Sequence, residues 1–174
     1  FLRYSHLCSD KPEDLEDCAA LVLPGVGAFA HGIRNLRNLG FIDLIRQKVR
    51  ENKTPILGIC LGMQLLADES EEKGNHEGLG LIPGRIRNIP AEHGSRVPHV
   101  GWNRVSPQND SSHYPRQNDY FYFDHGYHFE CSAEFISGIF NYPSAMTASV
   151  CWKHVAGTQF HPEKSGKAGL LFLR

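Results

Sequence analysis

The sequence lacks a dominant charge, a long apolar run and a paired cysteine motif. Its 174 residues carry 18 Lys and Arg against 19 Asp and Glu, which gives a formal net charge of −1. This balance gives no electrostatic argument for a nucleic acid or a membrane surface as a partner. No apolar stretch approaches the roughly 20 residues of a transmembrane helix, and no signal peptide is visible at the start.

The five cysteines are spread along the chain, at positions 8, 18, 60, 131 and 151. An odd number without a C-x-x-C pair is neither a disulfide framework nor a zinc site, and it fits a reducing cytoplasm. The ten histidines show no metal-ligand spacing, and the closest approach, His125 and His128, is more typical of structural or surface residues. We therefore expect no metal and no cofactor.

Strand-like and helix-like patterns alternate in the first half of the chain. We predict a buried strand over residues 19–23, helices over 28–39 and 42–50, a strand over 55–59 and a helix over 61–68. This order predicts an α/β domain in which a parallel sheet carries helices on its faces.

The pattern changes after residue 74. Short β-like pieces at 84–87, 120–123 and 148–152 are separated by polar turns, and residues 92–96 and 106–119 are typical of exposed loops. We therefore predict a mixed or antiparallel extension of the same sheet. No repeat, low-complexity segment or second domain is visible.

A single cysteine stands at a corner between an apolar run and a helical pattern, in GICLG at residues 58–62. The spacing G-x-C-x-G matches the nucleophile elbow, a tight strand-to-helix turn in which glycines relieve the crowding around one exposed side chain. The positive end of a helix that begins at Leu61 favours a thiolate at Cys60, and its N–H groups stabilise an oxyanion. The alternative is a buried structural cysteine, the commonest state of a free Cys.

A nucleophilic thiol needs a base, and the stretch QFHPEKS at residues 159–165 contains a histidine. If this stretch is extended, His161 and Glu163 project to the same side, because side chains alternate along a strand. A carboxylate beside an imidazole fixes its tautomer and stabilises its charged form, as the third member of a catalytic triad does. On its own, His-Pro-Glu is more typical of a surface turn.

Five motifs taken together resemble a known family. LPGVG at 23–27, GICLGMQ at 58–64 and QFHPEKS resemble the class I (triad) glutamine amidotransferases. PHVGWN at 98–103 and FYFDHGY at 121–127 are similar to the glutaminase subunits of imidazole glycerol phosphate synthase, the HisH family. The resemblance runs from about residue 12 to the end. It implies a flavodoxin-like, mostly parallel central sheet flanked by helices, in a single glutamine amidotransferase type-1 domain over residues 1–174.

The sequence departs from the family pattern in two places. The family opens with a strand and a loop of asparagine and glycines, so we expect this N-terminal first strand to be missing from the 174 residues. Around the middle histidine the family has Val and then Ser or Thr, where this sequence has Asp124 and Gly126. A hydroxyl is lost near the glutamine pocket and a carboxylate is gained, so we expect the substrate contacts to differ there.

The resemblance implies a role for each matched residue. Cys60 attacks the side-chain amide of glutamine, His161 takes the thiol proton and gives one to leaving ammonia, and Glu163 orients His161. The oxyanion hole is formed by backbone N–H groups from Gly25, Val26, Gly27 and Leu61. The glutamine substrate is contacted by Gln64, Gly126 and Tyr127. Without the resemblance, residues 24–27 are an ordinary strand-end turn.

The resemblance also implies a protein partner, a (β/α)8-barrel synthase subunit (HisF-like). That partner uses ammonia and a phosphorylated ribulosyl-aminoimidazole carboxamide nucleotide (PRFAR) to form imidazole glycerol phosphate and AICAR in histidine biosynthesis. The resemblance implies that Trp102, Asn103, Tyr122 and Lys164 form the interface with this partner and its gate. The alternatives are a core aromatic at Trp102 and a solvated charge at Lys164.

Three other functions stay open. Close relatives serve surface-polysaccharide pathways, where they amidate a sugar with a similar barrel partner, and Asp124 and Gly126 keep this alternative open. A cysteine peptidase or another thiol hydrolase is the alternative from a different class, and the motifs at 98–103 and 121–127 argue against it. A catalytically silent binding subunit is disfavoured by the complete set of Cys60, His161 and Glu163.

Overall fold

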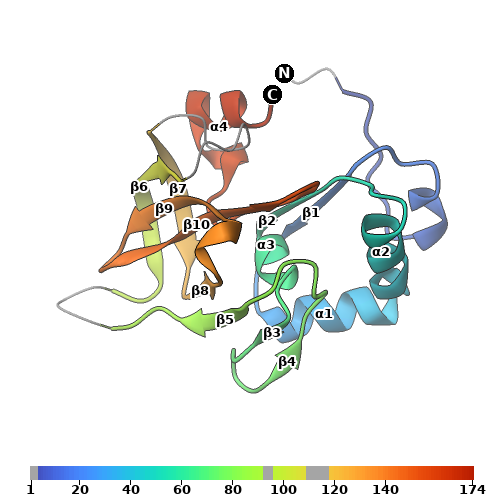
Figure 1. The fold of residues 1–174 in the computed structure, drawn as a ribbon, viewed down its shortest axis with the longest axis horizontal. Helices are drawn as coiled ribbons and strands as arrows, with labels where there is room; N and C mark the ends of the chain where they lie inside the picture. Colours follow the sequence, from blue (N-terminus) through green and yellow to red (C-terminus); the bar gives the residue numbers. More distant parts are fainter. Residues whose placement is uncertain (1–3, 92–95, 109–117) are drawn as a thin grey trace.

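A curled, mixed sheet organises the chain, of which the computed structural model describes residues 4–91, 96–108 and 118–174 (Figure 1). Its seven strands lie in the order β1-β2-β11-β10-β9-β6-β7. Their bounds are β1 Leu21–Gly25, β2 Ile56–Cys60, β11 Val155–Thr158, β10 Ala145–Trp152, β9 Ile136–Asn141, β6 His99–Pro107 and β7 Asp119–His125. The class predicted from the sequence, a helix-flanked α/β sheet with an antiparallel extension, is confirmed. Strands β1, β2 and β11 form the parallel part, and the other four join it antiparallel.

The parallel part brings three chain segments to one edge of the sheet. Gly25 at the end of β1 pairs with Cys60 at the end of β2, and Thr158 of β11 pairs with Ile59 on the other side. Because the carboxyl ends of parallel strands meet at one edge, the residues that follow Thr158 lie beside Cys60. Residues far apart in the sequence are thus assembled at the predicted corner.

A second, smaller sheet packs beside the first, in the order β4-β3-β5-β8. Its strands are β3 Glu69–Ser70, β4 His76–Glu77, β5 Arg85–Asn88 and β8 Tyr127–Glu130. Strand β8 follows β7 with only Gly126 between them, so the chain passes from one sheet to the other at this residue. The backbone of Tyr127 therefore lies at the junction of the two sheets.

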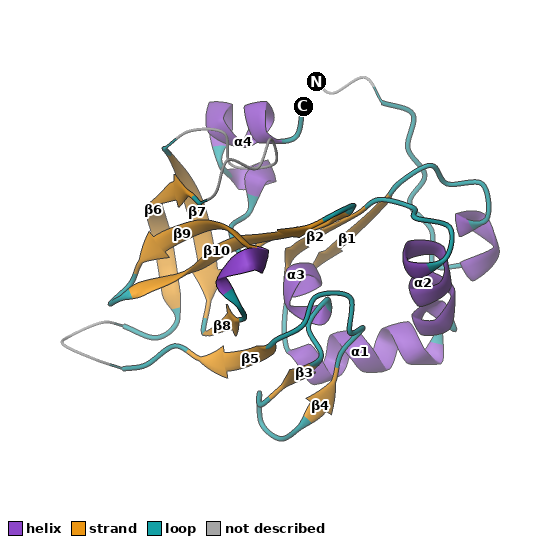
Figure 2. Ribbon diagram, in the orientation of Figure 1, coloured by secondary structure: helices purple, strands orange, loops and turns teal. Residues whose placement is uncertain are grey.

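Helices cover the parallel part of the large sheet on one side, and a short helix lies beside β7 (Figure 2). The helices are α1 Phe29–Asn38, α2 Phe41–Arg50, α3 Leu61–Leu65 and α4 Gly166–Phe172, with 3-10 turns at Pro12–Leu15, Ala133–Phe135 and Pro162–Lys164. Phe41, Ile45 and Val49 recur every four residues on α2 and are all buried, which is the pattern of a helix with one apolar face. No helix of the described ranges is long and apolar enough to span a membrane.

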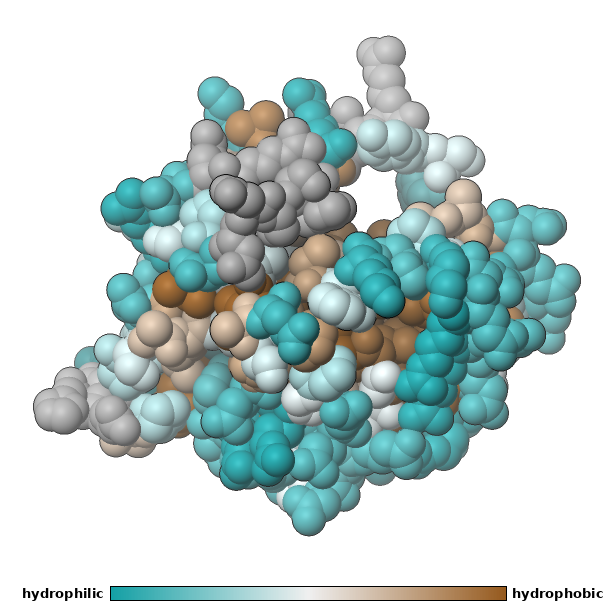
Figure 3. Space-filling view, viewed as in Figure 1, coloured by the Kyte–Doolittle hydropathy of each residue, from teal (hydrophilic) through white to brown (hydrophobic). Residues whose placement is uncertain are grey.

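The core divides between the two faces of the large sheet. Ile56 belongs to the cluster beneath α1, α2 and α3, whereas the next residue, Leu57, packs against the cluster that contains Phe121 and Phe160. This alternation follows from the two-residue period of a strand. On the face shown in Figure 3, hydrophilic residues cover α2 and the β3–β4 hairpin, and hydrophobic residues gather toward the middle.

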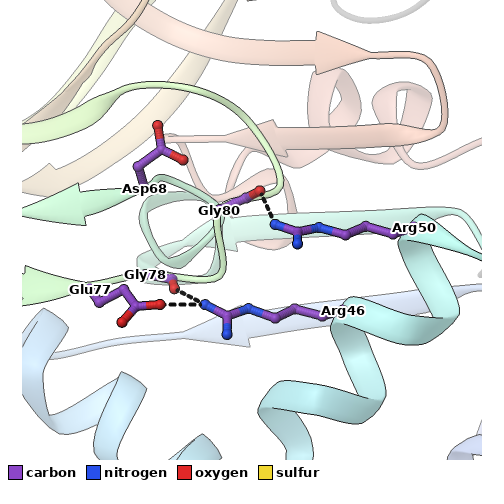
Figure 4. A pocket seen from close by; sticks show the side chains of 6 residues that line it. All are labelled: Arg46, Arg50, Asp68, Glu77, Gly78 and Gly80. Carbon is purple, nitrogen blue, oxygen red and sulfur yellow. Dashed lines mark hydrogen bonds and ion pairs between the residues drawn. The ribbon is translucent and has the colours of Figure 1, made fainter.

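Two arginines of α2 hold the loop that follows β4 (Figure 4). Arg46 donates to the Gly78 carbonyl at 2.9 Å and to the Glu77 carboxylate at 2.8 Å, and Arg50 donates to the Gly80 carbonyl at 2.7 Å. A hollow at the surface is lined by these groups. Its charged side chains are hydrogen-bonded to the loop backbone or to each other, so we assign it a structural role in fixing this loop.

The turn from β2 to α3 is strained at Cys60, whose φ is +54° and ψ −110°. A Cβ at Gly62 would lie 1.7 Å from the carbonyl oxygen of Leu23, and one at Gly58 would lie 2.6 Å from the carbonyl oxygen of Gly62. No side chain fits either gap. The predicted elbow is therefore present, and its glycines are required because the backbone of α3 closes onto β1 and β2.

The structure corrects three expectations about secondary structure. The strand expected over 19–23 is not buried, because β1 lies at the edge of the described sheet and alternates, with Val22 61% exposed. Ser106 and Pro107 belong to β6 and not to a loop. The helix expected over 61–68 ends at Leu65, where the chain turns toward β3. Residues 92–95 and 109–117 of the two expected loops lie outside the described residues.

The elbow packing generates a prediction about stability. Gly62→Ala should lower the free energy of unfolding by about 3 kcal/mol or more, the upper end of the usual cost of overpacking, because only backbone atoms face the added methyl group. Gly126→Ala is the matched control, since its Cβ would meet its nearest atom at 3.7 Å. Urea unfolding of both variants measures the difference, and equal midpoints would contradict the steric argument.

Candidate active site

Cys60 lies at the carboxyl edge of the parallel strands and is only 7% exposed. Its Sγ is 4.0 Å from the carbonyl oxygen of Asp124 in β7 and 3.8 Å from Nε2 of Gln159, which follows β11. The thiol is thus surrounded by three strands that the fold brings together. The position at the strand-to-helix turn is that of an elbow nucleophile, although this sulfur is buried.

Burial is the main influence on the Cys60 thiol and raises its pKa to about 11. The Leu61 N–H lowers this pKa, but by less than desolvation raises it, and the negative charge of Asp124 raises it further. The start of α3 therefore favours the thiolate, as expected, but burial of the sulfur outweighs this contribution. The thiol needs a base to lose its proton.

His161 and Glu163 form the expected contact, with Nδ1 of His161 2.7 Å from Oε1 of Glu163. The backbone that makes this contact differs from the prediction, because Pro162–Lys164 is a 3-10 turn and not an extended segment. The imidazole is buried and the carboxylate is half exposed. Since a carboxylate only accepts, Nδ1 carries the proton and Nε2 keeps its lone pair, which is the tautomer of a general base.

Strand β7 links the histidine turn to the thiol. The His161 N–H donates to the Tyr122 carbonyl at 2.8 Å, and the Tyr122 N–H donates to Oγ of Ser165 at 3.0 Å. The Ser165 hydroxyl donates in turn to the His161 carbonyl at 2.6 Å. Two residues further along the same strand, the carbonyl of Asp124 faces Cys60. One strand therefore holds both predicted catalytic segments in register.

Of the four residues expected at an oxyanion hole, Gly25, Val26 and Gly27 lie at and after the end of β1, and Leu61 begins α3. Gly25 pairs with Cys60, and a Cβ at Gly25 would lie 3.2 Å from that of Leu61. Val26 is 76% exposed. Gly27 has φ +99°, and no atom lies within 4 Å of the place where its Cβ would be. The loop after β1 is thus close to the thiol and has room to change its peptide orientations.

The residues expected to contact a substrate lie near the thiol but are engaged with each other. Nε2 of Gln64 donates to the Tyr127 carbonyl at 3.2 Å and to Oε1 of Gln159 at 2.9 Å. Gly126 is half-buried and has room for a Cβ, so the missing side chain at this position is not a steric requirement. The Asp124 side chain is exposed, and its carbonyl is the group that faces Cys60.

Gln159 is the site residue that the sequence reasoning does not single out. Its side chain is fully buried and bridges Gln64 and Cys60. The signal that identifies Gln159 is its place directly after a buried strand, β11, which runs parallel to the strand that ends at Cys60. That signal depends on knowing that β11 is the neighbour of β2, which local patterns do not reveal.

Three of the four residues expected at a partner surface lie together on one outer face, namely Trp102 of β6, Tyr122 of β7 and Lys164 of the 3-10 turn Pro162–Lys164. Trp102 pairs with Tyr122 across the strands, and their rings meet edge to face at 6.1 Å. Nζ of Lys164 lies 5.7 Å from the centre of the Tyr122 ring. Trp102 is 56% exposed, which excludes the core-aromatic alternative. Asn103 is turned toward its own chain and donates to the Asn141 carbonyl at 3.1 Å.

Comparison with known proteins defines the class to which this site belongs. The family model described as glutamine amidotransferase class-I matches residues 5–172. The chain therefore belongs to the class I glutamine amidotransferases. Within that class it belongs to the HisH family of imidazole glycerol phosphate synthase subunits, to whose members it is about 40% identical along most of its length.

Two of these relatives illustrate the match. The chain is 40% identical over 173 residues to the imidazole glycerol phosphate synthase subunit HisH 2 of Vibrio vulnificus, covering 98% of this chain and 81% of that protein. It is 43% identical over 169 residues to the HisH subunit of Methanothermobacter thermautotrophicus, covering 97% and 83%. A crystal structure of a glutamine amidotransferase has the same fold, with a TM-score of 0.74 at 21% identity, over 95% of this chain and 82% of that one.

The raised pKa of Cys60 predicts how the resting chain reacts with a small thiol reagent. With a pKa of about 11 the thiolate fraction at pH 7 is about 10⁻⁴. Alkylation of Cys60 by iodoacetamide should therefore be slow at pH 7 and rise about tenfold per pH unit up to pH 10. Peptide mass spectrometry separates Cys60 from the other four cysteines. A plateau below pH 9 would show that a charged pair already exists at rest.

Proposed function

We propose that the chain hydrolyses L-glutamine to glutamate and supplies the ammonia to a synthase subunit that consumes it. The observation that carries this proposal is the single strand, β7, that contacts both the elbow thiol of Cys60 and the His161–Glu163 pair. Membership of the HisH family supports it. A cytoplasmic setting, in which thiols stay reduced, fits this role.

The first chemical step is acyl transfer to sulfur. His161 removes the proton of the Cys60 thiol through Nε2, and the thiolate attacks the side-chain amide carbon of glutamine. The proton then moves from His161 to the amide nitrogen, and the C–N bond breaks to release ammonia and leave a γ-glutamyl thioester. Water, deprotonated by His161, hydrolyses the thioester to glutamate and restores the thiol. Glu163 holds the imidazole in the required tautomer and stabilises its charged form.

The negative oxygen of each tetrahedral intermediate needs hydrogen-bond donors that are already in place. The Leu61 N–H is one donor, since it already lowers the pKa of the neighbouring thiol. The second donor is an N–H of the loop that carries Gly25, Val26 and Gly27. The positive φ and open surroundings of Gly27 allow this loop to turn an N–H toward the site only when a partner favours that orientation.

The partner is a (β/α)8-barrel cyclase, HisF-like, that converts PRFAR and ammonia to imidazole glycerol phosphate and AICAR. The relatives are named as subunits of imidazole glycerol phosphate synthase, which supports this assignment. The two chains form a heterodimer through the outer face of β6 and β7. Trp102, Tyr122 and Lys164 supply an aromatic and cationic surface there.

The proposed nucleophile is tested in the complex with the barrel subunit. Cys60→Ala should reduce glutamine-dependent product formation by about 10⁴-fold or more, because no other group can form the thioester. Activity with added ammonium chloride should stay at the wild-type level, since the acceptor site is on the partner. Substantial glutamine turnover by this variant would remove Cys60 from the mechanism, and loss of both activities would point to failed assembly.

Activation by the partner gives a second prediction. The chain alone should hydrolyse glutamine about 10²–10³-fold more slowly than the complex with acceptor substrate, which is the usual effect of one missing oxyanion donor. Lys164→Glu should weaken the coupling of glutamine hydrolysis to product formation, whereas Lys167→Glu, an exposed lysine three residues away, should not. Equal rates with and without the barrel subunit would rule out gating of the hole. Unchanged coupling in Lys164→Glu would leave this lysine an ordinary solvated charge.

A further inference from the structure

Two buried histidines, which the proposed triad does not use, face each other across β6 and β7. His99 and His125 are cross-strand partners, and Nδ1 of His99 lies 3.2 Å from Nε2 of His125. The His99 ring is stacked on Tyr142, with ring centres 4.0 Å apart, and on Phe140 at 5.3 Å. Both imidazoles are thus held by aromatic packing in a fixed orientation.

The hydrogen bonds determine which nitrogen of each ring carries the proton. Nδ1 of His125 is 2.8 Å from the Tyr127 carbonyl, which can only accept, so this nitrogen is the donor. Nε2 of His125 then has a lone pair and accepts from Nδ1–H of His99. A proton on Nε2 of His125 would set two donors against each other.

The surroundings of His125 keep it neutral. Its pKa is lowered to about 3, mainly by burial and to a smaller extent by the positive charges of His99, His128 and His161, while the hydrogen bond to the Tyr127 carbonyl opposes the shift. Burial also lowers the pKa of His99. Around neutral pH the pair therefore acts as a fixed donor–acceptor unit.

The carbonyl that His125 holds is shared with the active site. The Tyr127 carbonyl accepts a second hydrogen bond from Nε2 of Gln64, whose other N–H is donated to Oε1 of Gln159. Nε2 of Gln159 then donates to Sγ of Cys60 at 3.8 Å. A continuous chain of hydrogen bonds thus runs through buried side chains from the histidine pair to the thiol.

The Tyr127 carbonyl determines which group donates and which accepts in each of these hydrogen bonds. Because that group only accepts, the Gln64 amide must present its nitrogen there and toward Gln159, which in turn leaves the Gln159 nitrogen facing the sulfur. Reversing either amide would place two oxygens against each other or an oxygen against the thiolate. An N–H beside the sulfur stabilises the thiolate more than the thiol, because bonds to charged acceptors are stronger.

We propose that His99 and His125 are positioning residues for the reaction of Cys60, because their hydrogen-bonded pair holds the Tyr127 carbonyl and so orients Gln64 and Gln159 toward the sulfur. This inference rests on the proposed function for its meaning in catalysis. Its effect on the thiol itself is independent of glutamine, so the two can fail separately.

The test compares three substitutions in the full chain. His125→Phe keeps an aromatic ring, although a somewhat larger one, and removes both hydrogen bonds, and His125→Asn keeps a donor at the place of Nδ1. His128→Asn, in the neighbouring strand β8, is the matched control. In the complex, His125→Phe should lower kcat for glutamine by about tenfold or more, the effect of one lost buried hydrogen bond, with ammonia-dependent activity unchanged. His125→Asn should recover kcat to within about threefold of wild type, and His128→Asn should match wild type.

Iodoacetamide labelling of Cys60 in the chain alone gives the second readout. His125→Phe should lower the labelling rate at pH 9 by about tenfold, and Gln159→Leu should lower it similarly, because each removes the N–H from the sulfur. When His125→Phe and Gln159→Leu are combined, the two losses in labelling rate should not add, since both substitutions interrupt the same series of hydrogen bonds. Additive losses, or labelling unchanged in a folded His125→Phe chain, would overturn the proposal. If the variants show the expected labelling pattern but the wild-type chain does not hydrolyse glutamine in the presence of the partner, only the proposed function would be overturned.

Thermal unfolding of each variant shows that it is folded. If His125→Phe does not fold, the comparison moves one step outward to His99→Leu and His99→Asn, of which only Asn keeps a donor toward His125. Both should fold, because Asn is smaller than His and Leu is close to it in volume. Equal labelling rates in these two variants would also overturn the proposal.

Discussion

The close approach of α3 to the ends of β1 and β2 is the constraint on which the rest of the site depends. Gly62 lies against the Leu23 carbonyl, and Gly58 lies against the first turn of α3. Only this contact bends the chain sharply enough to give Cys60 its positive φ and lift its sulfur to the sheet edge. Strain of this kind persists only where packing on both sides enforces it, and here the backbones of two strands and a helix do so.

The same packing makes the resting thiol unreactive. Burial that fixes the sulfur also removes water from it, and the pKa rises to about 11. The groups that oppose this rise are few, namely the N–H of Leu61 and, to a smaller extent, the positive charge of Lys164. Reactivity therefore depends on a base and on the orientation of a small number of N–H groups, rather than on the overall charge of the site.

Local patterns in the sequence are sufficient for the elbow and for the two long helices. The glycines around Cys60 and the four-residue spacing on α2 act within one turn of chain, so they can be read without knowing the fold. The contact of His161 with Glu163 is also local, although a 3-10 turn and not a strand produces it. Neighbours in sequence stay neighbours in either conformation.

What the sequence does not reveal depends on which strands pair. Gln159 reaches Cys60 only because β11 lies beside β2, and His99 reaches His125 only because β6 and β7 are paired in that register. The exposure of β1 and the placement of Ser106 in β6 have the same origin. Strand order is set by contacts between distant segments, and a single sequence carries no local record of it.

The attachment of His161 to β7 involves only backbone atoms of Tyr122 and the hydroxyl of Ser165. These hydrogen bonds do not involve the side chain of Tyr122, which projects to the outer face beside Trp102. If that face binds the proposed partner, side chains on β6 and β7 can change from one lineage to another while the backbone hydrogen bonds that hold the histidine turn are kept.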